Sequence, residues 1–362
     1  MSGIVEVARR AGVSISTVSN VLNNKRYVSP ELVRRVEEAA RELSYQPNPI
    51  ASSMKSNRTR TIGVITEDMC GVFYPYVIKG INSVAAEQGY QVVICDTQGM
   101  TGDTESFERE KKLFRQMISN RVDGIIFVST VSREYSRQYF SELRHLTEKT
   151  KKIPFVSLER DFTDVGIDSV YFDGYENSKT AVQHLIDHGC RRICHITGPS
   201  SMEIVKERNR GFLDALAENG LTADEEAITA HGDYTHQSGY MAMQEMFRKM
   251  PDLDGVFCDN DQMAVGALKV LKASNKKVPE DIKLIGYDDV FLASVVEPSL
   301  STIHIRKRHA GIEAAKILFE RILESEDKEA QETPMGIKMA GSLVVRNSTV
   351  PDMPEDWNLV DW

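Results

Sequence analysis

Residues 4–24 read IVEVARRAGVSISTVSNVLNN, and their spacing predicts two short helices joined by a tight turn. The apolar residues recur at helical intervals until Gly12 interrupts the pattern: Ile4, Val7, Ala8 and Ala11. Glycine adopts a positive φ at little steric cost, as the end of a helix requires. Ser14 then suits the N-cap of a second helix, which would bury Val18, Val21 and Leu22.

A third helix is predicted over residues 29–45, SPELVRRVEEAARELSY, with Ser29 as its N-cap and Pro30 in its first turn. Its apolar stripe consists of Leu32, Val33, Val36, Ala39, Ala40 and Leu43. Two helices around a glycine turn and a third supporting helix are typical of a helix-turn-helix DNA-binding head. Helical spacing alone also allows a three-helix packing module with one polar face.

The second helix would turn a polar face outward. Its outward residues are expected to be Ile15, Ser16, Thr17, Ser19, Asn20 and Asn23. Ser, Thr and Asn are short donors and acceptors that can reach base edges or phosphates.

Charge is distributed unevenly along the chain. Residues 1–60 hold ten Lys and Arg against five Asp and Glu, a net charge of +5. The whole chain of 362 residues carries −9, so residues 61–362 carry −14. A basic head on an acidic body indicates that only the head approaches a polyanion.

Two blocks carry a family resemblance: VARRAGVSISTVSNVLN (7–23) and VSPELVRRVEEAARELSYQPN (28–48). At their fixed spacing they resemble the head of the lactose-repressor (LacI/GalR) family of bacterial transcription regulators. The resemblance implies that the second helix lies in the major groove of double-stranded operator DNA. It places Ile15, Ser16 and Asn20 at base-reading positions and Thr17, Ser19 and Asn23 mostly on phosphates.

The connector NPIASSMKS (48–56) is either an inert linker or a short helix that begins at Asn48 and Pro49. A helix of about two turns is not stable alone in water. Met54 shares a face with Ala51 and precedes basic Lys55, which suits an apolar wedge at a DNA minor groove. The resemblance implies a hinge helix that pairs with its dimer mate and contacts DNA through Asn48, Ala51, Met54 and Lys55. Family members often read Ala-Arg-Ser-Leu here, so Ser52 lacks one possible phosphate contact.

After Thr61, apolar strand-like runs alternate with helical stretches, which predicts an α/β body of doubly wound parallel sheets in two subdomains. The strand signals fall at 61–66, 91–96, 122–128, 153–158, 169–173, 191–198, 254–260 and 282–289. The resemblance implies two lobes of periplasmic-binding-protein-like type that the chain crosses three times, with a ligand between them. The expected segments are a head (1–46), a hinge (47–60), an effector-binding and dimerisation domain (61–346) and a tail (347–362). Lobe one would be 61–170 plus 304–333, and lobe two 171–303 plus 335–346.

Open α/β sheets bind ligands at the carboxyl ends of their strands. The polar residues that follow strands are Asp96, Glu159, Asn260, Asp261, Asp288 and Asp289. Each could equally be an ordinary turn or N-cap residue. The resemblance selects an effector set: Phe73, Tyr74, Glu159, Arg208, Tyr234, Asn260 and Asp288. Carboxylates, an amide, an arginine and aromatic faces suit a sugar. Many members read Asn-Pro-Phe where this chain has Gly71-Val72-Phe73, so the shape of that loop differs.

Other classes lack their signatures. No P-loop, G-x-S-x-G or G-x-G-x-x-G motif occurs, so neither an enzyme nor a cofactor is expected. The cluster HGCRRICH (188–195) fits no usual zinc spacing, and no metal site is expected. No signal peptide or membrane span is visible, and the five scattered cysteines suggest a reduced, cytoplasmic protein. The tail lacks the apolar heptads of a tetramerisation zipper.

The sequence therefore predicts a homodimeric, sequence-specific transcription regulator, a repressor controlled by a sugar or sugar derivative bound between two lobes. One alternative is a regulator of carbohydrate metabolism controlled by a partner protein that docks on the first lobe. An enzyme or a transport binding protein on the same α/β scaffold is a further alternative, against which the DNA-binding head argues.

Overall fold

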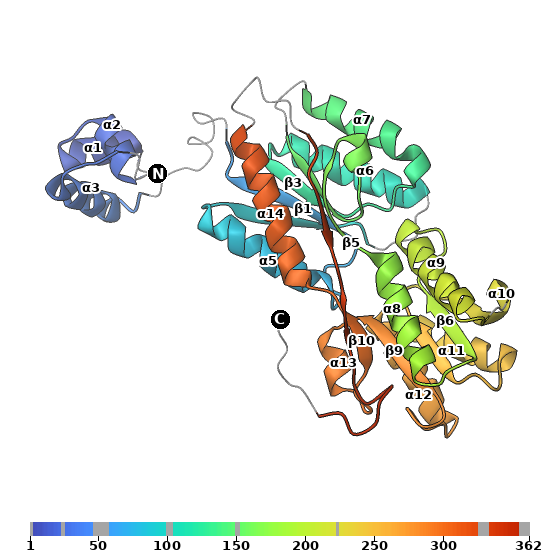
Figure 1. Cartoon of the computed structure of the whole chain (residues 1–362). Helices are drawn as coiled ribbons and strands as arrows, with labels where there is room; N and C mark the ends of the chain where they lie inside the picture. The colour runs from blue at the N-terminus through green and yellow to red at the C-terminus, as the bar shows by residue number, and fades with distance from the viewer. Residues whose placement is uncertain are drawn as a thin grey trace. The chain divides into compact units, whose positions relative to one another are not determined.

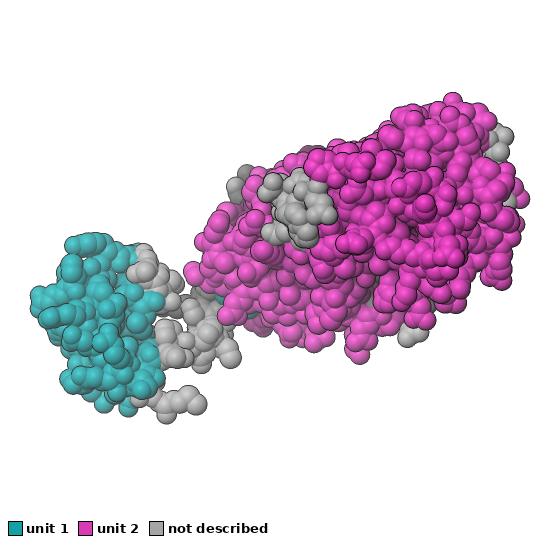
Figure 2. Space-filling view, turned by 90° about the horizontal axis from the view of Figure 1, so that it is seen from below, with its two compact units in different colours: residues 1–59 teal, residues 60–362 magenta. Residues whose placement is uncertain are grey.

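The computed structural model describes residues 3–22, 26–45, 58–98, 104–148, 153–221, 224–324 and 333–354. The chain folds into two compact units, residues 1–59 and 60–362, which are coloured separately in Figure 2. Across the described ranges no helix is long and apolar enough to cross a membrane.

The described part of the first unit contains three helices, α1 (Ile4–Ala11), α2 (Ile15–Leu22) and α3 (Pro30–Glu42) (Figure 1). Gly12 ends α1 in the left-handed region, with φ of 64°. Ser14 begins α2 as predicted, because its Oγ accepts a hydrogen bond from the Thr17 N–H at 3.1 Å. Val7, Val18 and Val36 are fully buried where the helices meet. The predicted helix-turn-helix head is confirmed.

The second unit holds two six-stranded sheets, and the first runs in the order β11-β5-β4-β3-β1-β2. All of its pairings are parallel. Its strands are β1 (Thr61–Thr66), β2 (Gln91–Asp96), β3 (Gly124–Phe127), β4 (Phe155–Glu159), β5 (Asp168–Phe172) and β11 (Gly336–Met339). A short 3-10 turn, η1 (Thr163–Val165), precedes β5.

Two helix pairs cover the faces of this sheet. Helices α5 (Tyr74–Glu87) and α14 (Lys307–Glu324) pack side by side on one face (Figure 1). Helices α6 (Thr104–Ser119) and α7 (Arg133–Glu148) pack on a separate aromatic core against the other. Gly80 on α5 permits the close approach of α14, since a Cβ there would collide with the Arg308 carbonyl.

The second sheet runs in the order β12-β10-β9-β8-β6-β7. Its strands are β6 (Ile193–Thr197), β7 (Thr229–His231), β8 (Gly255–Cys258), β9 (Lys283–Asp288), β10 (Ser301–His304) and β12 (Ser342–Val344). The helix pair α8 (Gly174–Asp187) and α9 (Glu203–Glu218) covers one face, and α11 (His236–Lys249) and α12 (Asp261–Ala273) cover the other (Figure 1). Two short helices, α10 (Glu225–Ile228) and α13 (Phe291–Val295), complete this lobe.

The chain passes between the two sheets after β5, after β10 and after β11. The two α/β lobes are therefore as predicted, with two corrections. The segment 335–346, expected wholly in lobe two, divides between the lobes, because β11 extends the first sheet and only β12 joins the second. The expectation of parallel sheets is also wrong at one edge, where β12 pairs with β10 in antiparallel fashion.

Candidate effector pocket and DNA-reading face

The outward face of α2 carries the predicted DNA-reading residues. Ile15 is 48% exposed although it is apolar, and Ser16 is exposed beside it. Thr17, Ser19 and Asn20 are half-buried, whereas Val18 and Val21 point into the core. The remaining predicted contacts lie outside the described residues: Asn23, Asn48, Ala51, Met54 and Lys55.

Arg35 on α3 fixes the turn that aims α2, a role that the sequence did not reveal. Its guanidinium Nη2 donates to the carbonyl of Ala11 at 2.6 Å and reaches that of Gly12 at 3.4 Å. Both carbonyls belong to the end of α1, where helical partners run out. The arginine therefore supplies a hydrogen-bond donor to the carbonyls at the turn between the two helices of the motif.

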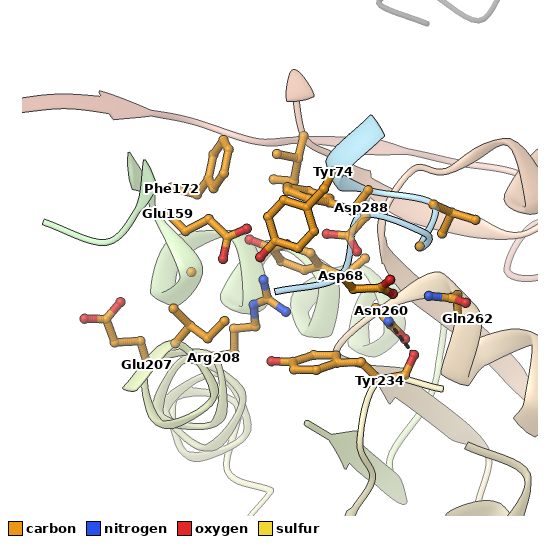
Figure 3. Close-up of a pocket in the computed structure, with 17 residues that line it drawn as sticks. Asp68, Tyr74, Glu159, Phe172, Glu207, Arg208, Tyr234, Asn260, Gln262 and Asp288 are labelled. Atoms are coloured by element: carbon orange, nitrogen blue, oxygen red, sulfur yellow. Dashed lines mark hydrogen bonds between the residues drawn. The ribbon is translucent and has the colours of Figure 1, made fainter. Parts of the chain in front are cut away.

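A pocket lies where the two lobes of the second unit face each other (Figure 3). All seven predicted effector residues line it. Its other lining residues are Asp68, Gly71, Val72, Phe172, Gly174, Ile204, Glu207, Gln262, Tyr287 and Ile305.

Lobe one contributes a carboxylate and aromatic rings. Glu159 ends β4 and turns into the pocket with φ of 71°. Tyr74, in the first turn of α5, donates its hydroxyl to Glu67 Oε2 at 3.1 Å and points toward Glu159 (Figure 3). Phe73 packs edge-on against Tyr74 and Phe172, with interplanar angles of 82° and 88°. Burial raises the pKa of Glu159, and the Tyr74 hydroxyl and Arg208 oppose that rise.

Lobe two contributes a cation and a second carboxylate. The Arg208 guanidinium lies 3.9 Å from the centroid of the Tyr287 ring, and its Nη1 donates to the Asp259 carbonyl at 2.7 Å. Asp288 ends β9 with φ of 98° and faces the pocket. Burial raises the pKa of Asp288 to about 7, although Arg208 and Lys307 favour its charged form.

Tyr234 and Asn260 form the remaining wall together. Asn260 caps α12, because its Oδ1 accepts from the Met263 N–H at 2.8 Å. Its Nδ2 donates to the Tyr234 carbonyl at 2.9 Å, the dashed bond in Figure 3. Tyr234 is held with φ of 68°, and its buried hydroxyl has no hydrogen-bond partner in the described part of the chain. Glu159, Tyr234 and Asp288 thus all occupy the left-handed region, which non-glycine residues adopt mainly where the surroundings enforce it.

The other polar residues that follow strands have structural roles. Asp96 accepts from the Met69 and Gln98 backbones, at 3.0 and 2.6 Å. Asp261 accepts from the Thr302 hydroxyl at 2.6 Å and from the Val290 N–H at 2.8 Å. Asp289 lies 2.8 Å from Arg346 and 2.9 Å from His304. These three acids therefore hold turns and neighbouring strands together and do not contribute to the pocket lining.

A second, more polar hollow adjoins the pocket and shares Glu159, Phe172, Ile204 and Glu207 with it. Its further lining residues are Arg133, Arg160, Asp161, Tyr171, Asp173, Tyr175, Glu203, Arg210 and Lys338. Arg160 is fixed there by the Ser129 carbonyl at 3.1 Å and by that of Val131. Lys338 pairs with Asp173. The charges of this hollow are largely matched within the protein.

Comparison with known proteins covers nearly the whole chain. Residues 3–48 match the family described as bacterial regulatory proteins, lacI family, and residues 182–349 match the periplasmic binding protein-like domain. The chain is 34% identical over 349 residues to the HTH-type transcriptional repressor PurR of Vibrio vulnificus (strain CMCP6), covering 96% of this chain and 98% of that protein. The PurR repressor of Aliivibrio fischeri (strain MJ11) is also 34% identical, over 97% of this chain and 99% of its own.

Solved structures show the same architecture. The lac repressor dimer bound to operator and the anti-inducer ONPF superimposes with a TM-score of 0.82 at 26% identity, covering 96% of this chain and 99% of that one. A complex of the transcriptional regulator CelR with cellobiose gives a TM-score of 0.68 at 31% identity, over 96% of this chain and all of the other.

Proposed function

The chain belongs to the lacI family of bacterial regulatory proteins, DNA-binding transcriptional repressors, and from this premise we propose that a carbohydrate bound between its lobes controls its hold on operator DNA. In this proposal a homodimer reads a near-palindromic site through α2. The observation that carries the proposal is the pocket itself, which joins Glu159 of one lobe to Arg208 and Asp288 of the other.

The chemistry of the pocket favours a carbohydrate. Carboxylates accept hydrogen bonds from hydroxyl groups, and an arginine fork donates them. The aromatic rings can cover the C–H faces of a sugar, since amphipathic ligands need both kinds of wall. The CelR complex, at 31% identity, holds the disaccharide cellobiose.

A flat heterocycle such as a purine base is the rival ligand. Covering both faces of such a base takes two parallel rings, although an aromatic ring can also meet a base edge-to-face. Phe73 instead stands at 82° to Tyr74 and 88° to Phe172, so this wall presents edges and faces in alternation. This wall therefore does not offer a planar ligand two parallel faces, and the polar groups Glu159, Arg208 and Asp288 carry the argument for a carbohydrate.

Ligand control would act through lobe closure. A carbohydrate that contacts both lobes binds the closed state more tightly and shifts the population toward it. The hinge segment, residues 47–60, joins the DNA-binding head to lobe one. Closure would therefore alter how the two hinges of a dimer meet on DNA. A useful response needs a coupling free energy of about 1–3 kcal/mol.

Calorimetric titration with neutral and amino monosaccharides, cellobiose, hypoxanthine and guanine tests the ligand class. We expect at least one carbohydrate to bind, and Arg208→Ala to weaken it at least about tenfold, since a charge-assisted contact and a stacked wall are both lost. Lys206→Ala is the matched control, because this lysine pairs with Glu203 on the helix surface. Binding of a purine base without any carbohydrate would refute the proposal.

In vitro selection from random duplexes tests the DNA role. Asn20→Ala should relax the selected sequence while leaving non-specific binding intact, because base contacts specify and phosphate contacts only position. Glu31→Gln, in the exposed first turn of α3, should leave the selected sequence unchanged. An unchanged preference in Asn20→Ala would mean that α2 is oriented differently on DNA.

A further inference from the structure

We infer that the effector is a cation: a sugar that carries a free, protonated amine, held by Glu159 and Asp288. This inference rests on the proposed function and narrows the class of its ligand. It comes from two carboxylates that face the pocket from opposite lobes and form no direct ion pair with its arginine among the described residues.

The pocket lining holds four carboxylates and one cation. The acids are Asp68, Glu159, Glu207 and Asp288, and the cation is Arg208. Glu207 points away from Arg208 in Figure 3 and lies 3.9 Å from Arg133 outside. Glu159 and Asp288 turn their carboxylates toward the same space (Figure 3), whereas Asp68 is exposed and its Oδ1 accepts the Cys70 N–H at 2.9 Å. Two facing acids therefore share the one arginine of the described lining.

Arg208 does not neutralise these acids directly. One arm of its guanidinium is engaged by the Asp259 carbonyl, and its plane lies over the Tyr287 ring. Within the described ranges, no ion pair of 4.0 Å or less joins it to Glu159 or Asp288. Its buried Nε also lacks a hydrogen-bond partner among the described residues.

A further acid stands directly behind the pocket wall. Glu67 is 2% exposed, and its Oε2 accepts the Tyr74 hydroxyl. Its Oε1 is buried without a partner among the described residues. Burial, followed by the charge of Glu159, raises the pKa of Glu67 well above its usual value. Tyr74 therefore lies between the carboxyl groups of Glu67 and Glu159, whose negative charges repel each other.

The adjoining hollow gives an internal comparison. It is lined by four cations, Arg133, Arg160, Arg210 and Lys338, against five acids, two of which it shares with the pocket. The excess of acids over cations is thus one in the hollow and three in the inner pocket, where the predicted ligand residues converge. A general acidity of the protein does not explain it.

An ammonium group matches this arrangement. It has three N–H donors, and Glu159 and Asp288 offer acceptors from opposite lobes. Closure around a neutral sugar would bury unpaired carboxylates, which is unfavourable unless they take up protons. The aromatic rings of Tyr74 and Tyr234 add faces that attract a cation.

Proton release should accompany binding. Burial raises the pKa of Asp288 to about 7 against the opposing charges of Arg208 and Lys307, and Glu159 and Asp259 raise it further. The pKa of Glu159 is raised by burial against Tyr74, Arg208 and Arg160. An arriving ammonium stabilises both carboxylates, so protons held in the empty pocket leave to the buffer.

The test is isothermal calorimetry on the full chain with glucose, galactose and mannose, each beside its 2-amino and its N-acetylamino derivative. We expect one amino sugar to bind at least about tenfold more tightly than its neutral and N-acetylated counterparts. Its heat of binding should vary with the ionisation enthalpy of the buffer. Glu159→Gln and Asp288→Asn should each remove most of that preference. Glu218→Gln, at the end of α9 and paired with Lys179, is the control.

The outcomes separate the two proposals. A neutral sugar that binds as tightly as its amino derivative overturns this inference and leaves the carbohydrate-controlled repressor standing. Failure of every sugar to bind overturns both. Should Glu159→Gln fold poorly, Asp288→Asn alone decides, because asparagine tolerates the left-handed backbone found there. An unchanged preference in a folded Asp288→Asn variant likewise overturns the inference.

Discussion

Glu110 on α6 is a buried acid that lies outside the effector pocket. The side chain is 3% exposed, and the Tyr139 hydroxyl donates to its Oε1 at 2.5 Å. Burial raises its pKa to about 7, although the hydrogen bonds of Tyr139 and Ser129 favour the charged form. The folded protein therefore holds a proton here that the unfolded chain, with a glutamate pKa of about 4.3, gives up earlier.

The consequence is a loss of stability as pH rises. Between about pH 4 and pH 7 the unfolded chain ionises Glu110 while the folded chain does not, so the free energy of unfolding falls and then levels off. Glu110→Gln keeps an acceptor for Tyr139 and removes the charge. We expect its melting temperature to exceed that of the parent by about 2–5 °C at about pH 8, and the difference to vanish near about pH 4.

Scanning calorimetry across this pH range measures the effect. Glu108→Gln, on the same helix but 63% exposed at its side chain, is the control and should leave the curve unchanged. A Glu110→Gln variant that is less stable than the parent at about pH 8 would show that the carboxylate is ionised and compensated in the folded state.

Neighbouring residues show how far sequence alone can define the site. Asp288 and Asp289 are both acids after one strand, yet Asp288 faces the pocket and Asp289 binds His304 and Arg346. The side-chain alternation of a strand does not separate them, because both have positive φ, 98° and 55°. The sequence does not single out Phe172 and Tyr287, since an aromatic residue in an apolar strand gives the same signal as a core residue. The family resemblance, and not periodicity, selected the seven pocket residues.

The elements show a similar limit. Long apolar strands such as β1 and β9 were predictable because both faces of a parallel sheet are covered. Four strands were not: β7, β10, β11 and β12, of three or four residues each. Windows this short cannot establish a period of two. The sheet to which β11 belongs depends on pairing with β5, a contact between distant parts of the sequence.

The turn between α1 and α2 supports a prediction about the head. Arg35→Ala would leave the Ala11 and Gly12 carbonyls without their guanidinium donor, which costs about 1 kcal/mol. We expect faster amide exchange at Gly12 and Val13 in the full chain, because local opening of the turn becomes easier. Hydrogen-exchange mass spectrometry measures this. Arg34→Ala removes the same charge from an exposed neighbour and should leave the exchange unchanged. Equal acceleration in both variants would attribute the effect to charge and not to the turn.

At the scale of the whole molecule, ligand control requires that a change in the pocket alter the position of one lobe relative to the other. Lys307, the first residue of α14, provides such a connection and is 1% exposed. Its Nζ donates to the carbonyls of Asp288 at 2.5 Å, Asp289 at 3.1 Å and Ile305 at 3.2 Å. Helix α14 packs on the sheet of lobe one, whereas Asp288 ends a strand of lobe two. The buried Lys307 ammonium thus links the backbone of Asp288 to a helix that packs on the opposite lobe.

Lys307→Met should weaken the coupling between effector and DNA more than it weakens effector binding. The methionine fills the space but removes the ammonium donor that joins the three carbonyls, so the strand end moves independently of α14. Coupling is the factor by which saturating effector changes DNA affinity, and linkage requires the same factor in reverse. Fluorescence anisotropy with a selected duplex, with and without the tightest-binding carbohydrate, measures it. We expect the factor to fall at least about fivefold toward unity, while Lys316→Met, exposed on the same helix, retains it. A Lys307→Met variant with full coupling would place the communication between lobes in the other two crossings, after β5 and β11.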